Sequence, residues 1–359
     1  MPEASIPLGS GRPTLAIEGQ VASDLAAALV ALEVRERIDG LAQAQLAFGN
    51  WGTRDGAPGY TLFGRDRLEF GKRLEVRLAD AVLFAGRVMA LQARFPKAGA
   101  GEAELVVQVE DALQDLRMKR RSRGFEQASL ADAAQRIASD HGLTASVEAD
   151  APTLPLLAQV NQSDLAFLRG QARRCEAEVW LDGTTLHLAA RRRRGGETLS
   201  LDYGGRLMGF DVRADLALQR TELSVAGWSV ADKQAVKETA DADSLLGAEV
   251  SDGEAGAALL RQKLGARPDT VAHLHPGSAD EARQLAEAWL RQINRRFVVG
   301  HGMAQPDARL RCGASVELTG LGPLFSGKYS LSEVTHRFDM AEGLRTEFVA
   351  ERPWIGRGG

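Results

Sequence analysis

The sequence predicts a mainly β fold with a mixed α/β middle, and three observations support this class. Apolar and polar residues alternate over several short segments between residues 29 and 110, as they do in half-buried strands. Apolar residues at helical spacing occur in the middle of the chain, between residues 129 and 293. Alternation returns near the end, between residues 329 and 348.

The first region reads as antiparallel strands joined by short turns. After a tail or first strand in residues 1–19, Val30, Leu32 and Val34 point to one side, and a turn follows at residues 38–40. The Gly-rich stretch 49–60 is predicted to be a loop without phosphate-binding spacing. Because no helical pattern intervenes, we expect an antiparallel barrel or sandwich. The other predicted strands cover residues 44–48, 74–78, 82–88 and 105–109.

The middle of the chain carries three capped helices. Residues 111–123 predict a short helical turn running into a basic connector. Ser129 and Asp132 have the spacing of a capping box, and Ser278 with Glu281 repeats it further on. Residues 207–228 read as two strands with Leu218, Leu223 and Val225 in the core, and residues 232–252 read as a polar connection.

The remaining capped helix lies between these two in the sequence. Ser163 is its expected N-cap, and Asp164 lies in its first turn. A hairpin with an Asp182-Gly183 turn follows it. The whole segment, QVNQSDLAFLRGQARRCEAEVWLDGTTLHL from residue 159 to 188, resembles the hub proteins of contractile phage tails and related injection systems. That family includes the late control protein D of phages and the N-terminal part of VgrG spike proteins. Cys175-Glu176 departs from the small residue or Gly that many relatives carry.

Residues 322–352 also resemble the sequence pattern near the end of this family's members, with Leu344 where Tyr is common. The resemblance marks a set of residues as candidate interface positions. They are Asn161, Gln162, Ser163, Asp164, Phe167, Trp180, Tyr329 and His336.

The resemblance implies the tail-hub fold, in which two tube-like antiparallel β-barrels and a mixed α/β domain share one chain. The first barrel would cover residues 1–118, and a second, discontinuous barrel would cover residues 206–232 and 305–352. The mixed domain would cover residues 119–205 and 233–304, and residues 353–359 would form a C-terminal tail. Three chains would then form a ring of six barrels, so that a homotrimer joins a hexameric inner tube to a trimeric spike.

The partners implied are the inner tube protein, a spike protein and baseplate wedge components. Because the chain ends at Gly359 without a needle domain, we expect the spike to be a separate protein. Neither catalytic residues nor a cofactor or metal are expected in such a mechanical component.

Composition agrees with a soluble assembly protein. The formal net charge of −4 gives no global basic field, so we expect no membrane or nucleic-acid binding in the resting state. Cys175 and Cys312 are predicted to be buried thiols. We see neither a secretory signal nor an apolar run of transmembrane length, and expect synthesis in the cytoplasm followed by assembly into a contractile particle.

Two patterns leave other functions open. His273 and His275 could share a metal on a strand, but no supporting ligand is close and a solvated loop is favoured. The run from Arg191 to Arg194 could contact phosphates, although a solvated turn or a patch meeting an acidic neighbouring subunit is favoured. The alternatives are therefore a baseplate-associated cell-wall hydrolase, which needs a carboxylate pair in a cleft, and a nucleic-acid-binding β-barrel protein.

Overall fold

The computed structural model describes residues 11–358 apart from positions 39, 55, 98–99, 150 and 231, and leaves out the side chains of Arg192 and Ala248. The chain divides into two compact units. The first comprises residues 1–114, 303–312 and 333–348, and the second comprises residues 115–302, 313–332 and 349–359. The predicted tail over residues 1–10 and Asp39 of the predicted first turn lie outside the described residues.

The first unit contains an antiparallel sheet in which most neighbours along the chain are also neighbours in space. In spatial order its strands are β3 (Leu29–Arg37), β4 (Gln43–Gly49), β9 (Glu104–Glu110), β8 (Ala81–Arg94), β7 (Arg73–Leu78), β1 (Thr14–Ile17) and β2 (Gln20–Val21). Residues 333–339 of β23 (Gly327–Asp339) pair with β3 on its other side. The strands predicted for this region are therefore confirmed.

Two details of this unit differ from the prediction. A register shift between Leu29 and Ala31 turns Val30 away from the buried face that holds Leu32 and Val34. The predicted Gly-rich loop contains a small hairpin of β5 (Gly52–Arg54) and β6 (Ala57–Gly59). The short helix α1 (Ser23–Ala28) precedes β3. The hydrophobic core of this unit includes Leu15, Leu32, Leu46, Phe48, Leu74, Val76, Val107 and Phe338.

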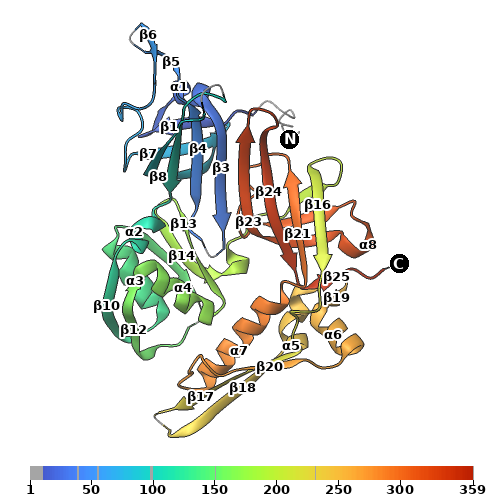
Figure 1. The fold of residues 1–359 in the computed structure, drawn as a ribbon. Helices are drawn as coiled ribbons and strands as arrows, with labels where there is room; N and C mark the ends of the chain where they lie inside the picture. Colours follow the sequence, from blue (N-terminus) through green and yellow to red (C-terminus); the bar gives the residue numbers. More distant parts are fainter. Residues whose placement is uncertain are drawn as a thin grey trace. The chain divides into compact units, whose positions relative to one another are not determined.

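The second unit begins with a helical and β-ribbon layer (Figure 1). The helix α2 (Leu113–Arg117) leads into β10 (Arg120–Ala128), which pairs with β12 (Leu154–Ser163) as a two-stranded antiparallel ribbon. The prediction of a basic connector over residues 111–123 is wrong beyond α2. The inward positions of β10 are Arg121, Arg123 and Phe125, and all three are half-buried. Two of these positions are arginines whose charges are neutralised inside the fold, so the sequence does not show the apolar alternation of a strand.

The capped helices and the hairpin are confirmed. Ser129 and Asp132 form a full capping box on α3 (Leu130–Asp140), and Ser163 caps α4 (Asp164–Arg174). The strands β13 (Ala177–Asp182) and β14 (Thr185–Ala190) form the hairpin, and β11 (Thr144–Glu148) joins it parallel to β14. At the turn Gly183 has a φ of 58°, a conformation that favours glycine.

A three-stranded sheet and three further helices follow. The strands are β18 (Gln234–Asp241), β17 (Glu222–Ser229) and β20 (Pro268–Val271), and α7 (Ala279–Asn294) lies along β17 and β18 (Figure 1). The predicted polar connection over residues 232–252 is wrong, because it holds β18, α5 (Ala242–Leu246) and the 3₁₀ turn η2 (Gly247–Glu249). Leu218 is also 69% exposed rather than in the core, whereas Leu223 and Val225 are buried. The helix α6 (Gly256–Leu264) was not predicted.

Among the described residues, the remaining strands pair with β23 or with one another. From β23 the spatial order runs through β24 (Gly343–Arg352), β21 (Val298–Ala304) and β16 (Leu207–Ala214). The strand β22 (Ser315–Thr319) pairs with β23 and with β15 (Leu199–Asp202). The other elements are η1 (Arg191–Arg193), α8 (Gly322–Phe325), β19 (Glu254–Ala255) and β25 (Trp354–Ile355), which pairs with β19. The predicted class, mainly β with a mixed α/β middle, is confirmed, and the structure has large antiparallel sheets.

Within the described ranges, no helix combines the length and the apolar character needed to cross a bilayer.

Candidate assembly site

The carboxylate of Asp164 is the centre of a buried polar cluster in the second unit. Its exposed fraction is only 1%, and it lies at the first position of α4. Oδ1 accepts hydrogen bonds from Arg123 at 2.9 Å and from Nε2 of Gln159 at 2.8 Å. Oδ2 lies 2.9 Å from Nε2 of His141 and 3.3 Å from Nε of Arg121. The cluster thus joins β10, β12, α4 and the end of α3.

The environment of Asp164 keeps it ionised. Burial alone would raise the pKa of this carboxyl, but the hydrogen bonds from His141 and Gln159, together with the charges of Arg123 and Arg121, lower the pKa below its ordinary value. Asp140 shares both arginines, and its pKa is lowered chiefly by the hydrogen bond from Arg123. A carboxylate held in this way is a fixed anion that orients two strands and two helices, not an acid that donates a proton.

The other residues of the NQSD segment shape the chain around this cluster. Asn161 adopts a φ of 47° where β12 has one more residue than β10, and its N–H donates to Oγ of Ser122 at 3.1 Å. The carbonyl of Gln162 accepts from Nε2 of Gln159 at 3.0 Å, and Oγ of Ser163 accepts from the N–H of Ala166. The motif therefore encodes a bulge, a turn and a cap.

Phe167 and Trp180 have different surroundings. Phe167 is buried and stacks on Phe125 with ring centroids 5.6 Å apart, which packs α4 against β10. Trp180 is half-buried on β13 and stacks on His187 at 4.9 Å, with the guanidinium of Arg194 5.3 Å from its ring. Of the two, only Trp180 retains surface that another molecule could touch.

Tyr329 lies in a cage around Arg352. This guanidinium is 4.3 Å from the Tyr329 ring and 3.8 Å from the Trp354 ring, and it donates to the carbonyls of Ser326 and Leu324. Burial raises the pKa of Tyr329 to about 12, against the opposing charge of Arg352. The cage holds the segment that contains β25, which the sequence suggested was a tail.

His336 belongs to the first unit and is fully buried on β23. Its Nδ1 lies 3.0 Å from Oγ1 of Thr346 on β24. Burial lowers the pKa of His336 to about 4, although the nearby carboxylates of Glu36 and Asp307 act in the opposite direction. The imidazole is therefore neutral at pH 7. Asp164, Phe167, Tyr329 and His336 thus lie inside the chain, and the assignment of the eight residues to an interface stays a prediction.

The arginine run after β14 is not a solvated turn at Arg191 and Arg194, so that prediction is wrong for these residues. Arg191 is buried and pairs with Glu351 and Glu178, and Arg194 donates to Glu178 at 3.2 Å. Burial alone would lower the pKa of Arg191, but the two carboxylates raise it overall. Arg193 is 61% exposed and pairs with Glu148. Arg191, Arg193 and Arg194 are thus each paired with a carboxylate of the chain.

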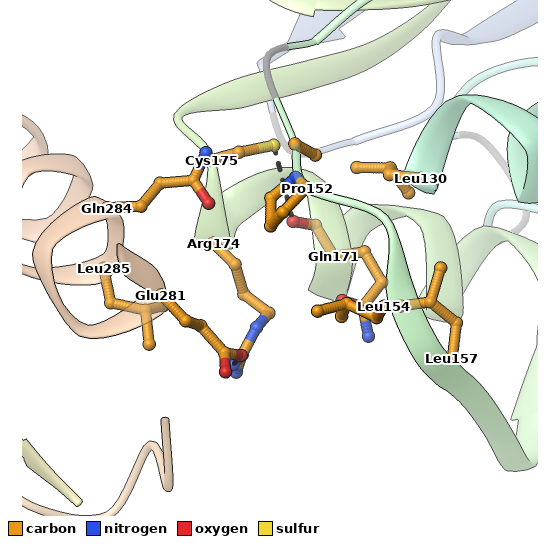
Figure 2. A pocket seen from close by; sticks show the side chains of 11 residues that line it. Leu130, Pro152, Leu154, Leu157, Gln171, Arg174, Cys175, Glu281, Gln284 and Leu285 are labelled. Atoms are coloured by element: carbon orange, nitrogen blue, oxygen red, sulfur yellow. Dashed lines mark hydrogen bonds and ion pairs between the residues drawn. The ribbon is translucent and has the colours of Figure 1, made fainter. Parts of the chain in front are cut away.

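A small open groove lies between α7 and the start of β12 (Figure 2). Leu130, Leu154 and Leu157 line one side, and Leu285 lines the other. Arg174 reaches Glu281 across its mouth, and the half-buried thiol of Cys175 lies at its edge. Cys312 is buried as predicted, whereas Cys175 is partly exposed. The groove therefore offers apolar contact and one ion pair.

The described residues contain no group of three side chains suited to a metal, and His273 packs edge-on against Trp289 instead. Wherever burial and neighbours clearly move a carboxyl pKa in the described part, they lower it, as at Asp164, Asp140 and Asp241. A glycosidase needs the opposite shift on one of its two carboxyls.

Two surfaces that sequence analysis missed are candidates for contact with other molecules. The rings of Trp51, Tyr60, Phe63 and Phe95 touch one another on the first unit, with exposed fractions of 52% for Trp51 and 63% for Phe95. The Gly-rich stretch with its aromatic residues was the available signal. The second surface is the outer edge of β16, which has no strand partner within the described ranges.

Solved structures similar to this chain include tail proteins and a component of a type VI secretion system. The 43 kDa tail protein of prophage MuSo2 from Shewanella oneidensis is 12% identical, with a TM-score of 0.71 over 96% of this chain and 99% of that chain. A tail protein from Neisseria meningitidis MC58 is 13% identical, with a TM-score of 0.69 over 96% and 97%. An E. coli type VI secretion component, described as similar to the T4 tail proteins gp27 and gp5, is 12% identical, with a TM-score of 0.56 over 92% and 76%.

These similarities confirm the tail-hub fold predicted from the sequence. Residues 11–340 match the family described as the Alg8 N-terminal domain, and the chain belongs to that family. No curated protein matches the chain.

Proposed function

We propose that the chain is a structural baseplate hub of a phage tail or contractile injection system. Three copies would form a ring that joins the hexameric inner tube to a separate trimeric spike. The observation that carries this proposal is the tail-protein fold over almost the whole length of the chain. The two tube-like barrels would follow the predicted limits, residues 1–118 and residues 206–232 with 305–352.

The surfaces of the chain support an assembly role. An unpaired strand edge such as that of β16 has backbone donors and acceptors ready to pair with another chain. Half-exposed rings such as Trp51 and Tyr60 are of the residue types that dominate binding energy in protein interfaces. Both surfaces would act by contact alone, and the proposed role is mechanical. Sheath contraction would drive tube, hub and spike forward together.

The buried charges support a rigid component. Asp164 and Arg191 each hold several elements together through contacts shielded from water. The hydrolase alternative would need a carboxyl with a raised pKa in a cleft. The nucleic-acid alternative would need a free basic groove, whereas Arg191 and Arg194 pair with Glu351 and Glu178.

The test is reconstitution of the purified chain with the tube protein and spike protein of the same particle, followed by electron microscopy. A threefold ring between tube and spike is the expected result. A chain that joins neither partner, or that cleaves cell-wall polymer on its own, would contradict the proposal.

A further inference from the structure

No described part of the chain covers the outer face of the β10–β12 ribbon. Arg121, Arg123 and Phe125 contact Asp164, Gln159 and Phe167, so they occupy the inner face of β10. The alternate residues point the other way and are exposed. On β10 they are Arg120, Ser122, Gly124 and Glu126, and on β12 they are Leu156, Ala158 and Val160.

The middle of this face is apolar. Leu156 is 55% exposed and Val160 is 67% exposed, which is unusual for branched apolar residues on a strand. Gly124 and Ala158 are register partners between them, and a Cβ at Gly124 would lie 2.8 Å from Cδ1 of Leu156. The missing side chain at Gly124 therefore leaves room for Leu156 and for the close approach of a second surface.

The two ends of β10 carry opposite charges without a partner. Arg120, with Lys119 before it, marks one end, and Glu126 marks the other. Within the described residues none of these three side chains forms an ion pair, although the neighbouring Arg121 and Arg123 form two each. Six residues of strand place the opposite charges about 20 Å apart.

We infer that this face binds the same face of a second copy of the chain through a twofold axis. The axis runs between the two ribbons, across the strands, at the level of Arg123. Such an axis reverses the strand direction and sets Arg120 of each chain opposite Glu126 of the other. It also sets the larger Val160 against the smaller Ala158.

The charge pattern is the reason to choose a second copy over a different partner. Opposite charges at the two ends of an apolar stripe are complementary to themselves after this rotation, as an isologous contact requires. A uniformly basic face would have needed an acidic partner instead. Across the pairs formed by the rotation, no like charges meet.

The contact is expected to be weak. A ribbon about 30 Å long and two strands wide offers much less than the roughly 800 Å² per partner of a standard stable interface. Association should therefore depend on protein concentration and weaken with salt, because the charges are exposed. The expected doubling is relative to the mass of the species at low concentration, whether that species is one chain or a ring. The inference is therefore independent of the proposed hub role.

The experiment is sedimentation velocity of the full chain over a range of concentrations, with Arg120→Glu, Glu126→Arg and the double variant. The mass of the wild-type species should double as concentration rises. Each single reversal should reduce the association constant roughly tenfold or more, because like charges then meet twice in the contact. The double variant should restore association, since its exchanged charges are again complementary.

Arg283→Glu is the matched control, because Arg283 is an exposed arginine on α7. It should leave the doubling unchanged, and circular dichroism should show that all variants fold. Wild-type protein that keeps one mass at all concentrations would overturn the inference. A double variant as weak as the single reversals would also overturn it, because the face would then meet a different surface.

Discussion

Arg123 donates a hydrogen bond to Oδ1 of Asp164 at 2.9 Å and thereby ties β10 to the first turn of α4. Arg123 also pairs with Asp140 at 2.6 Å, so one guanidinium links two helices to one strand. This relationship explains why a basic segment forms a strand: its arginines neutralise a carboxylate that has almost no access to water.

The first prediction concerns this carboxylate. Asp164→Asn keeps the size of the side chain but leaves Arg121 and Arg123 without their buried anion, so we expect a loss of about 3–5 kcal/mol in the free energy of unfolding. Urea denaturation followed by circular dichroism measures it. Asp140→Asn is the control, because Asp140 is partly exposed and its loss should cost about 1 kcal/mol. Equal denaturation midpoints for wild type and Asp164→Asn would contradict the assigned role.

The second prediction compares two arginines of one turn. Arg191→Met leaves the carboxylates of Glu351 and Glu178 without their shared cation, and should cost about 3–5 kcal/mol because the pair is buried. Arg193→Met removes an exposed charge and should change stability by less than about 0.5 kcal/mol. Thermal unfolding of the two variants separates these effects. A similar midpoint for both would mean that the Arg191 contacts contribute nothing.

The third prediction concerns pH. Burial lowers the pKa of His336 from the usual 6.5 to about 4. Between pH 4 and pH 6.5, the unfolded chain therefore binds a proton at this residue that the folded chain does not bind. The stabilisation is complete above pH 6.5 and is lost as pH falls toward 4, by on the order of 3 kcal/mol. Glu36, Asp307 and Arg311 are the charged groups that face the imidazole.

The measurement is the free energy of unfolding from pH 7 to pH 4.5 for wild type and His336→Gln. The variant should be less stable at pH 7 and should depend less on pH in this window. Parallel pH profiles for the two proteins would show that His336 is not the group responsible.

The fourth prediction concerns the exposed rings. Trp51→Ala with Tyr60→Ala should change the free energy of unfolding by only about 1 kcal/mol, because both rings are half-exposed. Co-sedimentation with the tube and spike proteins should nevertheless be lost if this cluster is a contact surface. Phe48→Ala is the contrasting variant: its ring is fully buried, so it should cost about 3–5 kcal/mol. Unchanged co-sedimentation of the double variant would remove the cluster from the assembly surfaces.

Sequence reasoning predicted what depends on local patterns. The caps at Ser129, Ser163 and Ser278 were predictable because one side chain and one turn decide them. The strand β10 was missed because its inward residues are charged, and their neutralisation depends on Asp164, some 40 residues away. The role of Arg191 was missed for the same reason, since Glu351 is 160 residues distant. The capping box predicted for Ser278 and Glu281 also differs in detail. The carboxylate of Glu281 accepts a hydrogen bond from the N–H of Gly277 rather than from that of the cap residue Ser278.

The candidate site was predictable as a segment but not in its roles. The residue pattern of the NQSD motif indicated that the segment matters. Only the structure shows that the motif forms a bulge, a helix cap and a buried anion. The aromatic cluster joins Phe95 to residues 51–63 through the sheet, and no spacing in the sequence predicts that contact.

The most direct test of the central claim is the mass of the purified chain in solution by light scattering, alone and after addition of the spike protein. At protein concentrations too low for the doubling through the β10–β12 ribbon, we expect three chains per particle, either before or after the spike is added. A chain that remains single in the presence of both spike and tube proteins would contradict the hub proposal.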